Sequence, residues 1–94
     1  MQLEWSNFAQ ESLIAIEEYI AADNPIAAKK ITDRISASTK ILLTYPYLGR
    51  IGRVLSTREL VVSKTKYIVS YRIRANKIQI LDIIHSSRQW PDTF

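Results

Sequence analysis

The sequence YIVSYRIRANKIQILDIIH, residues 67–85, carries the clearest structural pattern in the chain. Residues 67–74 alternate between two sets of side chains, as expected for a strand with one buried face. One set is apolar or aromatic and consists of Tyr67, Val69, Tyr71 and Ile73. The other set consists of Ile68, Ser70, Arg72 and Arg74. A turn at Ala75-Asn76 and the β-branched run 77–85 complete an antiparallel pair, whose second strand we expect in the sheet interior.

Two further strands are predicted upstream of this pair. Residues 54–63 contain the apolar run Leu60-Val61-Val62 and connect to the pair through a turn at residues 64–66. Residues 1–5 alternate apolar and polar side chains, which indicates a short first strand. The sequence therefore predicts four strands in all.

Two helices, over about residues 7–22 and 25–45, are predicted between the first strand and the others. Ser6 suits the N-cap of the first helix. Asp23 or Asn24 can cap the second helix, and Pro25 suits its first turn. The inward-facing positions recur at helical spacing: Ala9, Leu13, Ile16 and Ile20, then Ala28, Ile31, Ile35, Ser38 and Leu42. Because the link between the helices is so short, they are expected to form an antiparallel hairpin.

These elements predict an α+β fold in one domain that spans residues 1–94. The order is β-α-α-β-β-β, with the helical hairpin packed on one face of a twisted, mainly antiparallel four-stranded sheet. The connection 47–52 holds the two glycines of the chain, Gly49 and Gly52, which we expect to permit sharp turns at positive φ. A short polar tail, residues 86–94, follows the last strand.

Composition excludes several classes of site. The chain has 94 residues, no cysteine and one histidine, His85, so disulfides, thiol nucleophiles and cysteine metal sites are ruled out. A zinc site built from histidines is also disfavoured, and we expect no metal and no cofactor. No apolar run is long enough for a membrane span, so a cytoplasmic protein without a membrane partner is expected.

The charge is unevenly distributed along this basic chain, whose formal net charge is +4. Residues 1–49 hold four Lys and Arg against six Asp and Glu, a net charge of −2. Residues 50–94 hold nine against three, a net charge of +6. A basic second half indicates an acidic or polyanionic partner. We expect that partner on the face that carries Arg72 and Arg74.

Several short motifs, in this order, resemble the RelE/ParE superfamily of bacterial toxins. They are DNP at 23–25 with Ala27-Ala28 after it, YPYLGR at 45–50, TREL at 57–60, YIVSYR at 67–72, IQILDIIH at 78–85 and HSSRQWP at 85–91. The resemblance covers nearly the whole chain. It implies a growth-inhibiting toxin, encoded beside an antitoxin that silences it in a tight complex. It also implies that the antitoxin is acidic and has a DNA-binding N-terminal part.

The resemblance is closer to the ParE-like branch, whose members inhibit DNA gyrase, than to the RelE-like branch, whose members cleave mRNA on the ribosome. RelE-like nucleases usually carry an arginine after the aromatic residue of the fourth strand, whereas Ile68 follows Tyr67 here. No tyrosine follows Tyr71, although RelE-like nucleases often have one near the C-terminus. The leading hypothesis is a gyrase-binding toxin. The alternatives are a ribosome-dependent endoribonuclease and an inactive toxin kept for antitoxin binding.

Candidate site residues follow from these hypotheses. Those expected to bind the antitoxin or the target are Arg50, Arg53, Lys64, Lys66, Arg72, Arg74, Arg88 and Trp90. A metal-independent ribonuclease would use Arg58, Glu59, Arg72, His85 and Arg88. As neighbours on one strand, Arg58 and Glu59 face opposite sides of the sheet, and the sequence leaves open which one faces the basic side. His85 also suits a structural role at a strand end, and Trp90 suits either base stacking or covering the core.

Overall fold

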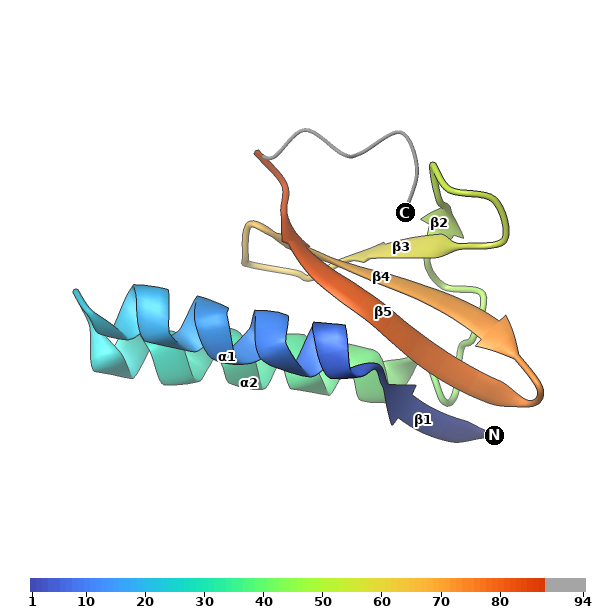
Figure 1. The fold of residues 1–94 in the computed structure, drawn as a ribbon, viewed down its shortest axis with the longest axis horizontal. Helices are drawn as coiled ribbons and strands as arrows, with labels where there is room; N and C mark the ends of the chain where they lie inside the picture. The colour runs from blue at the N-terminus through green and yellow to red at the C-terminus, as the bar shows by residue number, and fades with distance from the viewer. Residues whose placement is uncertain (88–94) are drawn as a thin grey trace.

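The computed structural model describes residues 1–87, which form two helices and five strands (Figure 1). The elements are β1 (Gln2–Trp5), α1 (Asn7–Ala21), α2 (Pro25–Ile41), β2 (Arg50–Ile51), β3 (Arg58–Val61), β4 (Tyr67–Arg74) and β5 (Lys77–His85). The two helices lie side by side as an antiparallel hairpin against one face of the sheet (Figure 1). This arrangement confirms the predicted α+β class.

The sheet has five strands in the order β1-β5-β4-β3-β2, so the prediction of four was wrong by one. The added strand, β2, is only two residues long and pairs antiparallel with β3, Arg50 opposite Glu59. β1 pairs parallel with β5, with Gln2 opposite Lys77. The remaining pairs are antiparallel, so the sheet is mixed.

The strand predicted over residues 54–63 is shorter, and its first part is a turn. The Thr57 N–H donates to the Val54 carbonyl over 3.1 Å, and the Thr57 hydroxyl donates to the same oxygen over 2.6 Å. Ser56, within this turn, has a φ of 66°. Extended pairing therefore resumes only at Arg58.

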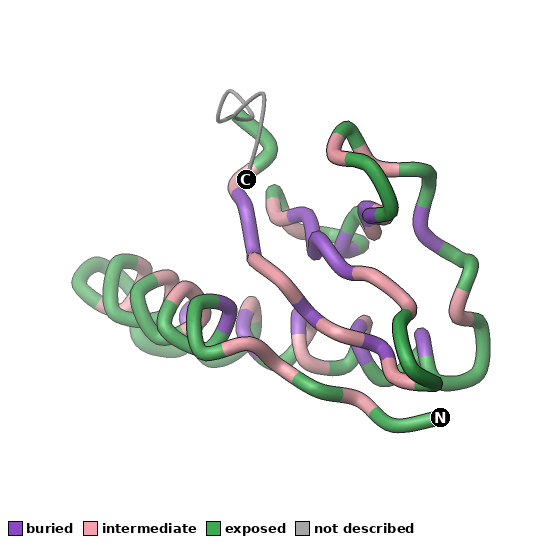
Figure 2. Tube along the Cα trace, turned by 45° about the vertical axis from the view of Figure 1, so that its right-hand side comes forward, coloured by how far each residue is buried: buried purple, intermediate pink, exposed green. Residues whose placement is uncertain are grey.

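Both helix starts form as expected from their capping residues. The Ser6 hydroxyl accepts from the Ala9 N–H, and the Asn24 side chain accepts from the Ala27 N–H, each over 3.0 Å. The second helix ends at Ile41 rather than near residue 45, because the chain tightens into successive hydrogen-bonded turns before Pro46. Most of the outer surface of the hairpin is exposed (Figure 2).

A bulge in β5 determines which side chains face the helices. Ser70 pairs with Asp82 and Tyr71 pairs with Ile80, which leaves Leu81 as an extra residue. Because of this shift, Ile80 and Ile83 both join the core, although one is at an even and the other at an odd position. On β4 the regular alternation persists, and Val69 and Tyr71 are fully buried against the helices. The predicted inward set of residues 67–74 is therefore confirmed. Ile68 and Ser70 of the other set are also buried, however, so the expectation of a single buried face was wrong for the first half of β4.

Replacing Ala75 with Gly is expected to stabilise the β4–β5 hairpin. Ala75 and Asn76 have φ values of 51° and 59°, as in a type I′ turn, and alanine adopts this region only at a cost. We expect the free energy of unfolding to rise by about 0.5–1 kcal/mol, as measured by denaturant titration. Ala37→Gly, in an exposed position of α2, is the control and should lower it. An equal loss of stability in both variants would contradict the assignment of strain to Ala75.

Candidate functional site

The far face, defined as the side of the sheet opposite to the helices, carries Arg72 and Arg74 at alternate positions of β4. The intervening Ile73 packs against the core, so both arginines point away from the helices. The Arg72 Nε donates to the Gln79 Oε1 over 2.6 Å, a neutral partner that leaves its charge uncompensated. The Arg74 side chain is exposed and makes no hydrogen bond or ion pair within residues 1–87. These two side chains are the strongest cationic feature of the far face.

An acidic residue on the same face lies beside them on β1. Glu4 forms a 3.2 Å ion pair with Lys77 and accepts a 3.2 Å hydrogen bond from the Gln79 amide. The Glu4 charge is thus compensated by Lys77 rather than by Arg72 or Arg74. The cations of the Arg72–Arg74 pair remain available to an external acidic group.

Glu59 holds the other basic residues of the far face in place. It is only 7% exposed, and its carboxylate accepts from the Arg50 Nε and Nη2 over 3.2 and 3.1 Å. Its second oxygen accepts from the Arg53 backbone N–H over 3.0 Å. The structure therefore brings Arg50, Arg53 and Glu59 together in one cluster. Both oxygens of the Glu59 carboxylate accept hydrogen bonds within this cluster.

Arg58 lies on the other side of β3 and belongs to a structural cluster around the segment that precedes β2. Its Nη1 donates to the Gly49 carbonyl over 2.8 Å, and its guanidinium carbon lies 4.9 Å from the centre of the Tyr47 ring. The structure thus settles the question that the sequence left open, because Glu59 and not Arg58 faces the basic side.

Tyr71 anchors the same segment from β4. Its fully buried hydroxyl donates to the Pro46 carbonyl over 2.8 Å and accepts from the Gly49 N–H over 2.9 Å. Burial raises the pKa of Tyr71, whereas the Gly49 hydrogen bond and the Arg58 charge act in the opposite direction. This cluster was not predicted, and the only sequence signal for it was a tyrosine among the inward residues of the strand.

Gly49 is required for close approach rather than for backbone freedom. Neither Gly49 nor Gly52 has a positive φ, so the expectation of turns at positive φ was wrong. A Cβ built on Gly49 would lie 2.7 Å from Cε1 of Tyr71 and 2.9 Å from the Glu59 carbonyl oxygen. Only glycine lets this segment pass so near to Tyr71 and β3.

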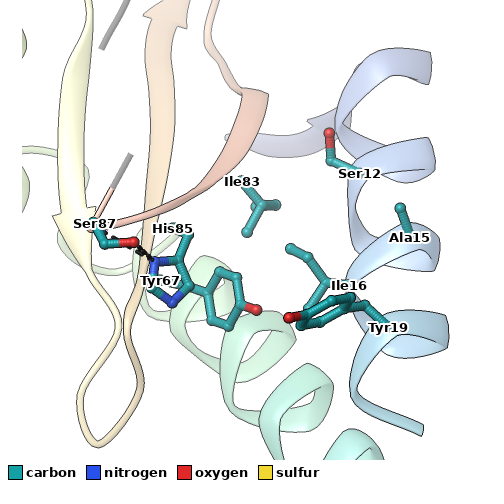
Figure 3. A pocket seen from close by; sticks show the side chains of 8 residues that line it. All are labelled: Ser12, Ala15, Ile16, Tyr19, Tyr67, Ile83, His85 and Ser87. Carbon is teal, nitrogen blue, oxygen red and sulfur yellow. Dashed lines mark hydrogen bonds between the residues drawn. The ribbon is translucent and has the colours of Figure 1, made fainter. Parts of the chain in front are cut away.

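His85 lines a cleft of about 550 Å³ on the helix side, between α1 and the ends of β4 and β5 (Figure 3). Its Nδ1 accepts from the Ser87 backbone N–H over 3.1 Å, which leaves Nε2 to carry the proton of the neutral ring. The ring meets Tyr67 edge to face with the centroids 5.2 Å apart. The hydroxyl groups of Tyr67 and Tyr19 point toward each other across the cleft (Figure 3).

The candidate residues fall into separate places in the fold. Arg72 and Arg74 are together. Arg50 lies on the same face two strands away, about 10 Å in the sheet plane, and the Arg53 backbone N–H lies beside it on Glu59. Lys64 and Lys66 lie in the turn before β4, at the opposite end of that strand. The other two candidates, Arg88 and Trp90, lie outside the described residues.

The four described candidates for ribonuclease chemistry do not converge. Arg58 and Glu59 lie on opposite sides of β3 and already make intramolecular hydrogen bonds. Arg72 is on the far face, whereas His85 is in the cleft on the helix side. Within residues 1–87 the far face thus presents Arg72 and Arg74, whose charges have no acidic partner. It does not bring a base and cations to one phosphate.

The helical hairpin on one side of a mixed sheet, with basic side chains on the other, defines this chain as a toxin of the RelE/ParE superfamily. It belongs to the ParE toxin family of type II toxin–antitoxin systems (parDE), whose sequence profile matches residues 3–90. The predicted superfamily is thereby confirmed.

Individual relatives agree with this assignment. The chain is 40% identical over 90 residues to the Sinorhizobium fredii protein named "Putative toxin Y4kP", and the match covers 96% of this chain and 93% of that protein. It is 32% identical over 87 residues to toxin RelE2 of Caulobacter vibrioides, with coverage of 93% and 97%. A solved structure of the chromosomal ParDE system from P. aeruginosa is similar, with a TM-score of 0.81 and 28% identity. The match covers 90% of this chain and 95% of that one.

Proposed function

We propose that this ParE-family toxin inhibits growth by binding DNA gyrase, and that a cognate antitoxin neutralises it in the cytoplasm. The separation of the candidate catalytic residues is the observation that carries the proposal. Phosphodiester cleavage needs a proton carrier and cations around one phosphate, and His85 and Arg72 lie on opposite faces of the sheet. Inhibition by binding needs only a complementary surface and no converging catalytic residues. The choice of gyrase as the target rests on the resemblance to ParE-like toxins. No helix within residues 1–87 has the length and apolar character to cross a membrane.

The far face supports an acidic antitoxin as the partner. Arg72 and Arg74 offer positive charge that Glu4 and Glu59 leave uncompensated, since each of these acids already has intramolecular partners. A disordered acidic segment that folds on this surface would bring its carboxylates to the arginines. The DNA-binding N-terminal part expected of the antitoxin would lie outside this contact.

A gyrase supercoiling assay with purified toxin tests the target. We expect the toxin to inhibit supercoiling in a concentration-dependent way and the antitoxin to restore it. The same preparation should leave translated messages intact in primer extension, a control that matters because one relative is named RelE2. Discrete cuts in mRNA with unaffected gyrase would overturn the proposal in favour of the ribonuclease. Inactivity in both assays, with retained antitoxin binding, would indicate the inactive toxin.

A further inference from the structure

We propose that two copies of this chain associate through β2, at the edge of the sheet opposite to β1, around a two-fold axis at Ile51 (Figure 1). The two sheets join into one, and the segments that flank β2 cover each other's apolar side chains. This inference goes beyond the proposed function and does not depend on the target of the toxin. It uses neither of the two far-face arginines, Arg72 and Arg74.

The backbone of β2 is arranged for symmetric pairing. The Gly52 N–H donates to the Thr57 carbonyl over 2.8 Å, so it points toward β3. By alternation along the strand, the N–H and carbonyl of Ile51 point outward, and neither has a hydrogen-bond partner within residues 1–87. Two antiparallel copies of β2 centred on Ile51 exchange both hydrogen bonds between these groups. A single outward residue suffices, because an isologous contact places the same residue on both sides of the axis.

The segments on either side of Ile51 expose large apolar side chains. Tyr47 and Leu48, which precede β2, are 68% and 53% exposed, and Leu55, in the loop after β2, is 92% exposed. Ile51 itself is 81% exposed. The Tyr47 ring lies against the Arg58 guanidinium, and Arg58 pairs with Ile51, so Tyr47 and Ile51 lie on one face of the β2–β3 hairpin. We call Tyr47, Leu48, Ile51 and Leu55 the hairpin patch.

The hairpin patch is complementary to its own symmetry mate. Because the two copies of β2 run in opposite directions around Ile51, residues 53–56 of one copy lie beside residues 46–49 of the other. Leu55 then contacts Tyr47 and Leu48 of the partner subunit, and the reverse contact follows by symmetry. The four side chains expose about 500 Å² per copy, which with the flanking backbone approaches the roughly 600–1,000 Å² per partner of a specific interface. We therefore expect a dimer that depends on concentration.

The charges near β2 permit this pairing. Arg50 is compensated by Glu59 of its own copy over 3.1 Å, and it lies opposite the partner subunit's Gly52, which has no side chain. Arg53 has no ion pair within residues 1–87. It lies two residues from the axis, so the two copies of Arg53 are about 14 Å apart along the strands. This separation exceeds the Debye length of about 8 Å at physiological ionic strength, so their repulsion is screened.

Sedimentation equilibrium of the purified toxin tests the proposal. We expect the weight-average mass to rise with concentration from 10.8 kDa toward twice that value. Ile51→Glu should weaken self-association at least tenfold, because it places two like charges beside each other at the axis. The control is Ile26→Glu, at a 78% exposed position in the first turn of α2, which should change it less than threefold. A protein that stays monomeric at every concentration overturns the inference, as does an equal loss in both variants.

The salt dependence of self-association distinguishes apolar pairing from a charged contact. The dissociation constant of the dimer should change less than threefold between low and high salt, because the contact consists of backbone hydrogen bonds and apolar side chains. A tenfold or greater weakening by salt would show that charges hold the copies together and would contradict pairing through the hairpin patch.

Amide hydrogen exchange locates the contact in the unmodified chain. We expect exchange of the Ile51 N–H to slow at least tenfold between dilute and concentrated toxin. The Leu3 N–H, which points outward at the opposite edge strand β1, is the internal control and should keep its rate. Slowed exchange at Leu3 with an unchanged rate at Ile51 would mean that the copies pair through β1, and the inference would be wrong. Neither outcome bears on the gyrase assay, so the proposed function is tested separately.

Discussion

Tyr71→Phe is expected to lower the free energy of unfolding by about 2–4 kcal/mol, because two backbone groups lose their partner at once. The Gly49 N–H would lose its acceptor and the Pro46 carbonyl its donor, both in the buried segment that leads to β2. The ring itself is retained, so packing in the core changes little. Urea titration followed by circular dichroism measures the effect.

Tyr67→Phe is the matched control, because Tyr67 has the same inward orientation on β4 but lies at the surface of the cleft. Its loss of stability should be clearly smaller. Equal stability of Tyr71→Phe and the wild-type protein would show that water or a rearranged segment satisfies Gly49 and Pro46.

The same hydroxyl predicts a pH dependence. The pKa of Tyr71 is raised in the folded protein, above its ordinary value of about 10 in the unfolded chain. The folded state therefore keeps the proton longer, and the stabilisation is fully present below about pH 10. It is lost as the pH rises through the higher pKa of the folded state. The difference in stability between wild type and Tyr71→Phe should shrink over that range. A constant difference would contradict this linkage.

The sequence predicted those features that depend on local periodicity. The inward set of β4 follows from strict alternation, and the starts of both helices follow from Ser6 and Asn24-Pro25. It also placed Arg72 and Arg74 on one face, because a spacing of two residues determines that relation in any regular strand.

Features that depend on contacts distant in sequence were not predictable. β2 forms because Arg50 and Ile51 pair with β3 across a turn. A strand of two residues is too short to show any periodicity in the sequence. The Gly49–Tyr71 hydrogen bond joins residues 22 apart, and nothing local marks either one as a partner. The side that Glu59 faces is fixed by the pairing of β3 with β4. Periodicity alone predicted only that Glu59 and Arg58 face opposite sides of the sheet.

Reversing both arginines of the far face, in Arg72→Glu/Arg74→Glu, is expected to weaken the toxin–antitoxin complex at least a hundredfold. Each substitution replaces attraction to an acidic partner with like-charge repulsion, which costs several kcal/mol across a desolvated contact. The salt dependence of the affinity should also become shallower, because fewer opposite charges remain to be screened. Titration calorimetry at two salt concentrations measures both effects.

Lys30→Glu/Arg34→Glu is the control with the same change in net charge, located on α2, on the opposite side of the sheet from the far face. It should retain most of the affinity. If both double variants lose the same affinity, the loss is caused by the change in net charge, and the far face is not the antitoxin-binding surface. Retained tight binding by the Arg72/Arg74 variant would mean that the contact is chiefly apolar.

The parallel pairing of β1 with β5 has a consequence for synthesis of the toxin. Gln2 pairs with Lys77, so β1 has no partner strand in its own chain until residue 77 has been synthesised. The helical hairpin can form early from neighbouring residues, whereas closing this long loop is entropically costly and delays completion of the sheet. A nascent chain therefore carries β1 unpaired until residues 77–80 have been synthesised. Premature termination before residue 77 should yield no finished toxin.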